Sequence, residues 1–298
     1  MFVDMLGKTR VKLGLHTHTT LSDGRATPEE AARIYLDKGY DAIAITDSWK
    51  YRDECEIEGL KIFSGCEYEI GGTDSSDTVH IIGVGMTSDP AIPEDWKNMK
   101  KTAFLKGAEV IKKIKLFNGL SIVGHPAWSL NTPEQLAILG DFDVAEVCNS
   151  VFEYEEGGSD YSGEILDRLA KEGKVSNLVA ADGARYYEGD ECRSWIMVEA
   201  TDTDTQSIIR SVRAGRFYAT QGPEVHIEQI APDKVRVVCS PVDKVLFIGN
   251  SVSEPSRVFS EEGIVKAEYT KSPTDRFVRA EVTDKDGNKA WTNYVIFD

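Results

Sequence analysis

The chain has few cysteines, and none of them forms the pattern of a disulfide framework or a thiolate metal site. The five cysteines, at positions 55, 66, 148, 192 and 239, are scattered and include no Cys-x-x-Cys pair. We therefore expect free, inert thiols. The N-terminal segment MFVDMLGKTR has neither an apolar core nor a cleavage site of a secretory signal, so we expect a cytoplasmic protein.

Positive charge is also scarce. Lys and Arg number 34 against 50 Asp and Glu, which gives a net charge of -16. Such a surface repels a phosphate backbone, so we expect no nucleic-acid partner. No run of 18 apolar residues is present that would cross a membrane, so we expect no membrane partner. If the substrate is an anion, its site must concentrate positive charge from metal ions or a few arginines.

Residues 11–220 alternate between short apolar runs and helical segments, which predicts a mostly parallel sheet or barrel. A helix is predicted to begin at Thr27-Pro28-Glu29-Glu30, which supplies a capping Thr, an early Pro and a capping-box Glu. Further helices are predicted at 94–117, 132–139, 160–173 and 203–214. Strands are predicted at 11–16, 41–46, 61–70, 78–85, 121–126, 143–150, 175–182 and 194–200.

The pattern changes near Gly222. The segments VHIEQI, KVRVVC, KVLFIG, VKAEY, FVRAEV and WTNYVIF are short and alternating, with no helical stretch among them. Asp286-Gly287 predicts a hairpin between two of these strands. We therefore predict two domains: an α/β domain over 1–222 and a small antiparallel β-sandwich of unknown role over 223–298.

Four of the five histidines fall in or at the ends of predicted strands. His16 and His18 are two residues apart in an extended segment, so both imidazoles can meet one ion. His80 and His125 lie in later strands. Acids lie at matching positions, namely Asp23, Asp47, Glu67 and Asp182. Because the carboxyl ends of parallel strands converge on one face of a barrel, we predict a metal site there.

The donor types indicate the metal and the reaction. Imidazole and carboxylate together favour Zn, Mn or Fe over Ca or Mg. A carboxylate can bridge two such ions, and hydroxide activated by two metals is a strong nucleophile, so hydrolysis is the expected chemistry. No Gly-x-Ser-x-Gly nucleophile pattern competes with this interpretation.

The segment LHTHTTLSDGRATPEE, followed by GYDAIAITD, resembles the start of the PHP (polymerase and histidinol phosphatase) family. GCEYEI, VHIIGVG, GHPAW and an Asp after a late strand continue the resemblance in order. RAGRFYATQGP and VTDKDGNKAWTNYVIF resemble a subgroup with a C-terminal β domain. The resemblance implies a distorted (β/α)7, TIM-like barrel with two or three metals that hydrolyses phosphate esters. It also implies that amide or carbamate hydrolysis is possible on the same site.

The resemblance further implies the ligands. One ion would take His16, His18, Glu67 and Asp182, and a second would take Glu67, His80 and His125. A third would take Asp23 and two more histidines, but this sequence lacks both. Ser48 stands at one of their places. If the family's Asp-x-His motif is aligned so that its Asp is Asp182, Ala184 stands at the position of the second missing histidine. If the motif is shifted by one residue, Arg185 stands at the histidine position and Gly183 at the Asp position. We therefore predict two divalent ions, with the third site empty or weak.

Other residues near the strand ends are candidates for the reaction. We hypothesise that Arg185 replaces the missing cation and binds an anionic group, and that Arg25 also contacts substrate; the alternative for both is a structural or surface role. Asp47 would accept a proton or support His16, and Asn149 would contact substrate. Asp23 would orient a ligand or hydrogen-bond its loop.

These observations predict a metal-dependent hydrolase, specifically a phosphoesterase acting on a small anionic phosphate ester. Two alternatives stay open. The same site could hydrolyse an amide or carbamate ester, or the barrel could be a non-catalytic protein that binds a ligand. The retained His16, His18, Glu67, His80, His125 and Asp182 favour catalysis, because a pure binding protein does not need a two-metal ligand set.

Overall fold

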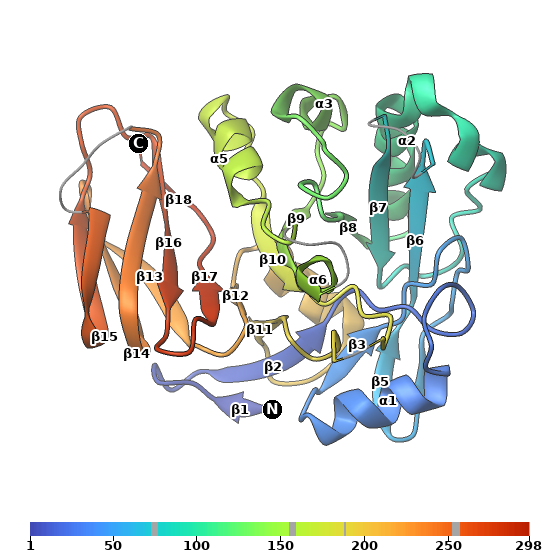
Figure 1. The fold of residues 1–298 in the computed structure, drawn as a ribbon, viewed down its shortest axis with the longest axis horizontal. Coiled ribbons are helices and arrows are strands. Elements are labelled where there is room, and N and C mark those ends of the chain that lie inside the picture. The colour runs from blue at the N-terminus through green and yellow to red at the C-terminus, as the bar shows by residue number, and fades with distance from the viewer. Residues whose placement is uncertain (73–76, 155–158, 188, 252–256, 298) are drawn as a thin grey trace.

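The computed structural model describes residues 1–72, 77–154, 159–187, 189–251 and 257–297 (Figure 1). It has a mixed α/β fold, as predicted. Its strands fall into a 13-stranded sheet and a 5-stranded sheet. None of the helices in the described ranges is long and apolar enough to cross a membrane.

The first half of the larger sheet contains the N-terminal strands. Strands β2, β3 and β5 are parallel neighbours, and β11 and β12 continue the sheet in antiparallel order on the other side of β2. The bounds are β1 (Phe2–Val3), β2 (Thr9–Gly14), β3 (Ala42–Ala44), β4 (Cys55–Ile57), β5 (Leu60–Phe63), β11 (Trp195–Glu199) and β12 (Phe217–Thr220).

The smaller sheet runs in the order β10-β9-β8-β7-β6. Its strands are β6 (Gly65–Ile70), β7 (Val79–Val84), β8 (Leu120–Val123), β9 (Val144–Asn149) and β10 (Asn177–Ala181). Strand β7 is antiparallel to both of its neighbours, whereas β8, β9 and β10 are parallel. The predicted single strand over 61–70 is wrong, because Ser64 separates β5 and β6, which lie in different sheets.

Two single β-bridges connect the sheets. Thr17 pairs with Ala184, and Ser48 pairs with Glu67, both in parallel orientation. The described residues therefore form two sheets joined at one end, where the resemblance implies one continuous barrel. The bridges bring the segments that follow β2, β3 and β10 together beside β6.

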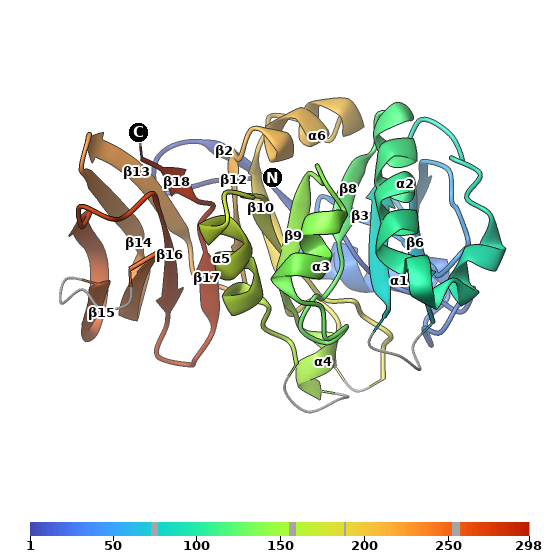
Figure 2. The same ribbon diagram turned by 90° about the horizontal axis from the view of Figure 1, so that it is seen from above.

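The helices lie around the sheets (Figure 2). They are α1 (Pro28–Asp37), α2 (Ala103–Leu116), α3 (Pro133–Ile138), α4 (Val151–Tyr154), α5 (Gly163–Lys171) and α6 (Thr205–Arg213). The capping box predicted at Thr27 is confirmed, because both reciprocal Thr27–Glu30 hydrogen bonds are present. The helix predicted over 94–117 begins as the 3-10 turns η1 (Glu94–Asn98) and η2 (Lys100–Thr102), because Met99 has a non-helical backbone.

The C-terminal strands are all antiparallel, and the described ones belong to the larger sheet. They are β13 (Val225–Ala231), β14 (Lys234–Gly249), β15 (Val258–Thr270), β16 (Phe277–Thr283), β17 (Lys289–Trp291) and β18 (Val295–Ile296). The predicted hairpin around Gly287 joins β16 to β17. Strand β17 also pairs with β12, so hydrogen bonding continues across Gly222. The boundary at Gly222 and the separate sandwich stay predictions.

Candidate metal centre

Five buried side chains meet where the two sheets join. Glu67 lies on β6 and His80 on β7, while His16 and His18 follow β2 and His125 follows β8. Each is at most 3% exposed. The sequence thus brings donors on or after four separate strands together where the two sheets join.

Glu67 is the centre of the group. Its Oε1 lies 3.0 Å from His80 Nδ1 and 3.3 Å from His125 Nε2. The distance from Oε1 to His16 Nε2 is 3.6 Å, and Oε2 lies 3.3 Å from His18 Nε2. One carboxylate therefore faces four imidazoles, an arrangement in which a single side chain can bridge two cations.

Two further observations show that these residues fit a divalent transition metal. The Nε2 atoms of His16 and His18 lie 3.1 Å apart and face each other, so both can reach one point between them. The Nε2 atom of His80 is buried and has no hydrogen-bond partner among the described residues. Imidazole nitrogens with a shared carboxylate are a donor set typical of Zn, Mn or Fe.

Glu146, on β9, was not predicted from the sequence. Its Oε1 lies 2.7 Å from His16 Nδ1, and its Oε2 accepts hydrogen bonds from the His125 backbone N–H and Asn149 Nδ2. A carboxylate behind a histidine fixes the imidazole so that its other nitrogen faces the metal. The available signal was a single acid in the otherwise apolar run VAEVCN.

The electrostatics of the centre follow from this crowding of acids and imidazoles. Burial opposes the charged form of His16, but Glu146 and Glu67 outweigh it and raise the pKa of His16 to about 10. Burial lowers the pKa of His125 to about 4. The pKa of Glu67 is well below its usual value despite burial, because His16 and His80 favour the carboxylate. Without metal, the two carboxylates retain a proton on His16, which a bound cation would displace.

The structure does not bring Asp182 to this centre. Its Oδ1 accepts hydrogen bonds from the backbone N–H groups of Arg193 and Ser194, and its Oδ2 from Tyr35 and the backbone N–H of Cys192. The predicted metal ligation by Asp182 therefore finds no support in its contacts, because both oxygens already accept hydrogen bonds from these groups.

The register shifted by one residue agrees better with the structure. Gly183 N–H donates to the His16 carbonyl, and a Cβ on Gly183 would lie 2.6 Å from Asn149 Oδ1. Gly183 therefore stands on the side of the metal centre, in a left-handed conformation with φ +59°. In that register the Asp position of the family pattern is Gly183, and its histidine position is Arg185.

Asp23 connects Arg185 to the metal centre, because it contacts both Arg185 and His18. Its Nε is 2.7 Å from Asp23 Oδ2, while Asp23 Oδ1 is 3.2 Å from His18 Nδ1. The backbone of Arg25 donates to the Arg185 carbonyl, and its exposed guanidinium lies over the Tyr187 ring at 4.0 Å. Two arginines thus stand beside the group, and Asp23 pairs with a guanidinium at the position where the family pattern has a third metal.

Asp47 and Asn149 have contacts that differ from their predicted roles. Asp47 accepts hydrogen bonds from the Thr19 backbone, the Thr19 hydroxyl and the Ser22 hydroxyl, so it anchors the loop after His18. Asn149 donates to Glu146 and accepts from the Val151 backbone. These bonds favour positioning roles over direct proton transfer by Asp47 or substrate contact by Asn149.

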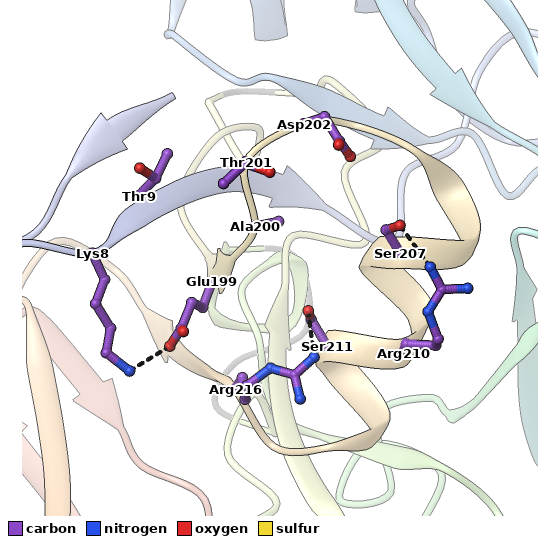
Figure 3. Close-up of a pocket in the computed structure, with 10 residues that line it drawn as sticks. All are labelled: Lys8, Thr9, Glu199, Ala200, Thr201, Asp202, Ser207, Arg210, Ser211 and Arg216. Carbon is purple, nitrogen blue, oxygen red and sulfur yellow. Dashed lines mark hydrogen bonds and ion pairs between the residues drawn. The ribbon is translucent and has the colours of Figure 1, made fainter.

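A separate surface pocket of about 420 Å³ lies at the other end of β2 (Figure 3). Glu199, which lines it, pairs with Arg10 near the start of β2, whereas His16 follows the end of that strand. Within it, Lys8 pairs with Glu199, and Arg210 and Arg216 each donate to a serine. The pocket contains none of the predicted site residues, so it is distinct from the metal centre.

The fold and this geometry define a mixed α/β protein with a buried histidine–carboxylate centre suited to divalent metals. The chain belongs to the PHP domain family, because residues 14–180, more than half of its length, match the sequence profile of that family. No curated protein matches the chain.

Solved structures resemble the chain at low identity. A two-domain protein from Bacteroides vulgatus, containing a predicted PHP-like metal-dependent phosphoesterase, is 18% identical with a TM-score of 0.52; the match covers 98% of this chain and 97% of that one. A protein from Bifidobacterium adolescentis, described as a candidate metal-dependent phosphoesterase, is 15% identical over 68% and 97% of the two chains, with a TM-score of 0.41. An amidohydrolase from Chromobacterium violaceum with bound sulfate is 16% identical over 69% and 96%, with a TM-score of 0.42. The first of these supports the fold over nearly the whole chain.

Proposed function

We propose that this protein is a metal-dependent hydrolase that cleaves a small phosphate ester. The observation that carries the proposal is the meeting of His16, His18, His80 and His125 on the single buried carboxylate of Glu67. We also propose that the strands joined by the two bridges act as the distorted barrel that presents these donors at one end.

We assign separate roles in metal binding and substrate binding to residues of the centre and to the two arginines beside it. His16, His18, Glu67, His80 and His125 would hold two divalent ions, and Glu146 would orient His16. Bound divalent ions polarise phosphoryl oxygens and lower the pKa of water. Arg185 and Arg25 would bind the anionic group of the substrate, because a guanidinium can donate two parallel hydrogen bonds to a phosphate. These fixed charges attract an anion despite the net charge of -16.

The test begins with protein purified without chelator. We expect about two equivalents of Zn, Mn or Fe per chain, and release of inorganic phosphate from a panel of small phosphate esters assayed with that metal. His16→Ala should lose metal and activity, because it removes one of the imidazoles that face Glu67. Asp37→Asn is the control, since Asp37 lies at an exposed position of α1 outside the centre.

The same panel should contain amides and carbamate esters. Release of amine or alcohol without phosphate would replace the phosphoesterase proposal with the amide or carbamate alternative. Failure to bind metal at all would favour a ligand-binding protein without catalysis. Full turnover by folded, metal-free His16→Ala would contradict the mechanism.

A further inference from the structure

Glu69 is an acid beside the metal centre that the family pattern does not use. It lies on β6 two residues after Glu67, so both side chains point to the same face of the sheet. Across the sheet, the residue paired with Glu69 is His80 on β7. Glu67, Glu69 and His80 each offer a ligand atom within 4.8 Å of the others.

Ser48 holds Glu69 in this position. The Ser48 hydroxyl donates to Glu69 Oε1 at 2.7 Å, and the Ser48 backbone forms the bridge to Glu67. Ser48 stands where the family pattern places a third-site histidine. In this chain the same position orients a carboxylate toward the Glu67 side of the centre.

The number of carboxylates in the centre favours Glu69 as a ligand. The resemblance implies two carboxylates, Glu67 and Asp182, for two divalent ions. The Asp182 oxygens instead bind Tyr35 and the backbone of residues 192–194. Among the residues described, Glu69 lies next to both Glu67 and His80, and His80 Nε2 has no hydrogen-bond partner. Glu69 would restore the second negative charge.

We propose that Glu69 is a metal ligand, which together with Glu67 and His80 holds one of the two divalent ions in place of the carboxylate that the family pattern supplies from the segment after β10. This inference rests on the proposed function in that it requires a two-metal centre. It differs from the resemblance in assigning the second carboxylate to β6 rather than to the segment after β10.

The experiment compares Glu69→Gln with Asp182→Asn. Each full-length protein is stripped with chelator and dialysed against buffered free Zn²⁺, and bound zinc is measured by elemental analysis alongside circular dichroism. We expect two zinc ions in the unchanged protein and in Asp182→Asn, and one in Glu69→Gln. Glu69→Gln keeps the shape of the side chain and can still accept from Ser48, so we expect it to fold. Glu69→Asp should recover part of the lost zinc affinity.

The outcomes separate the two proposals. If Glu69→Gln binds two zinc ions with unchanged affinity, Glu69 is not a ligand, and the inference is overturned while the two-metal hydrolase stands. A loss of zinc in folded Asp182→Asn but not in Glu69→Gln overturns it in the same way. If the unchanged protein binds no zinc, manganese or iron, the proposed function itself fails. Co²⁺ loading gives an independent readout, because the visible spectrum of bound Co²⁺ should change in Glu69→Gln and not in Asp37→Asn, a variant at an exposed position of α1.

Discussion

The contacts of single side chains decide how the metal centre is organised. Glu146 binds His16 Nδ1 with one oxygen and the His125 backbone with the other. It thus holds two of the four histidines at once, and the Asn149 side chain fixes it by donating a hydrogen bond to the same carboxylate. Metal affinity should therefore depend on a residue that does not reach the metal.

Glu146→Gln tests this dependence. The substitution removes the negative charge behind His16 and makes at least one of the three hydrogen bonds to this side chain unfavourable, so we expect zinc affinity to fall by about 10–100-fold. Competition with a chromophoric chelator measures the change. Glu153→Gln, at an exposed position on α4, is the control and should leave the affinity as it is. Equal affinity in Glu146→Gln and the unchanged protein would contradict this role.

The sequence predicts most of the centre at this scale. The histidines and Glu67 could be found because donors after successive strands converge. The contacts of Asp182 disfavour its predicted role as a ligand, and the sequence could not decide this because two registers fit the pattern and a shift of one residue moves a side chain to the other face of a strand. The sequence alone does not predict roles for Glu146 and Glu69, because the role of an acid within a strand becomes evident only when the neighbouring strands are placed.

Among the secondary structure elements, the turn after β10 has the strictest steric requirement near the centre. Gly183 has φ +59°, and a Cβ there would lie 2.6 Å from the Asn149 side chain. Asn149 in turn donates to Glu146. The chain therefore needs glycine at this position both for its backbone and for the space in front of Asn149.

Gly183→Ala should disturb this turn in two ways. The left-handed backbone costs about 1–2 kcal/mol for a residue with a Cβ, and the displaced Asn149 weakens the support of Glu146. We expect lower thermal stability and lower zinc affinity. Gly173→Ala is the control, because Gly173 also has a positive φ but nothing lies within 4 Å of its Cβ position. It should lose stability alone; unchanged zinc affinity in Gly183→Ala would disprove the steric connection.

The loop between β1 and β2 contacts β13 through a charged cluster. Asp4 binds Arg10 at 2.6 Å, and Arg10 reaches His226, which also pairs with Glu224. Burial opposes the charge on Asp4, but hydrogen bonds from the Lys8 backbone and Arg10 outweigh it and lower its pKa below 3.8. The carboxylate form is therefore favoured in the folded protein.

This shift predicts a pH dependence of stability. Because the folded pKa is depressed, the contribution of Asp4 is complete above the unfolded value near 3.8 and is lost as pH falls through the lower folded pKa. Urea unfolding of metal-free protein between pH 5 and pH 3 should show a shallower loss of unfolding free energy in Asp4→Asn than in the unchanged protein. Asp37→Asn, at an exposed position of α1, serves as the control. Identical slopes in Asp4→Asn and the unchanged protein would argue against the assignment.

The order of elements was largely predictable from the sequence, whereas their pairing was not. Apolar periodicity located the strands and most helices, and Thr27 marked the start of α1. The split at Ser64 and the 3-10 turns before α2 depend on which sheet each segment joins. This is determined by tertiary packing and not by the local sequence. The connection of β17 to β12 joins residues about 70 positions apart and leaves no local signal.

At the scale of the whole molecule, α5 lies between the smaller sheet and the C-terminal strands (Figures 1 and 2). Arg279 on β16 is fully buried and binds both oxygens of Asp167 on α5 at 2.7 Å. Tyr161 bonds to Arg279, and Tyr294 bonds to Asp167. A buried charge pair thus connects the two parts of the chain.

Asp167→Asn should be strongly destabilising, because it leaves the buried Arg279 charge with only the longer contact to Glu281 at 3.6 Å, at a cost of up to about 3–5 kcal/mol. The double variant Arg279→Met/Asp167→Leu should recover much of this loss, since it removes both charges. Chemical denaturation measures both. Glu164→Gln, which removes an exposed pair with Arg168 on the same helix, should cost less than about 1 kcal/mol. A similarly small effect of Asp167→Asn would show that the pair does not stabilise the connection.

The position of β17 between β12 and β16 has a consequence for any shortened form of this protein. Ending the chain at Gly222 would remove β17 and turn β12, now an inner strand, into a sheet edge with free backbone hydrogen-bonding groups. It would also remove Trp291 from the main core and leave a large void there. A newly exposed strand edge whose side chains are apolar pairs with strands from other chains. We therefore expect the isolated N-terminal part to aggregate, and the C-terminal strands to serve as the cover that keeps the metal-binding part in solution.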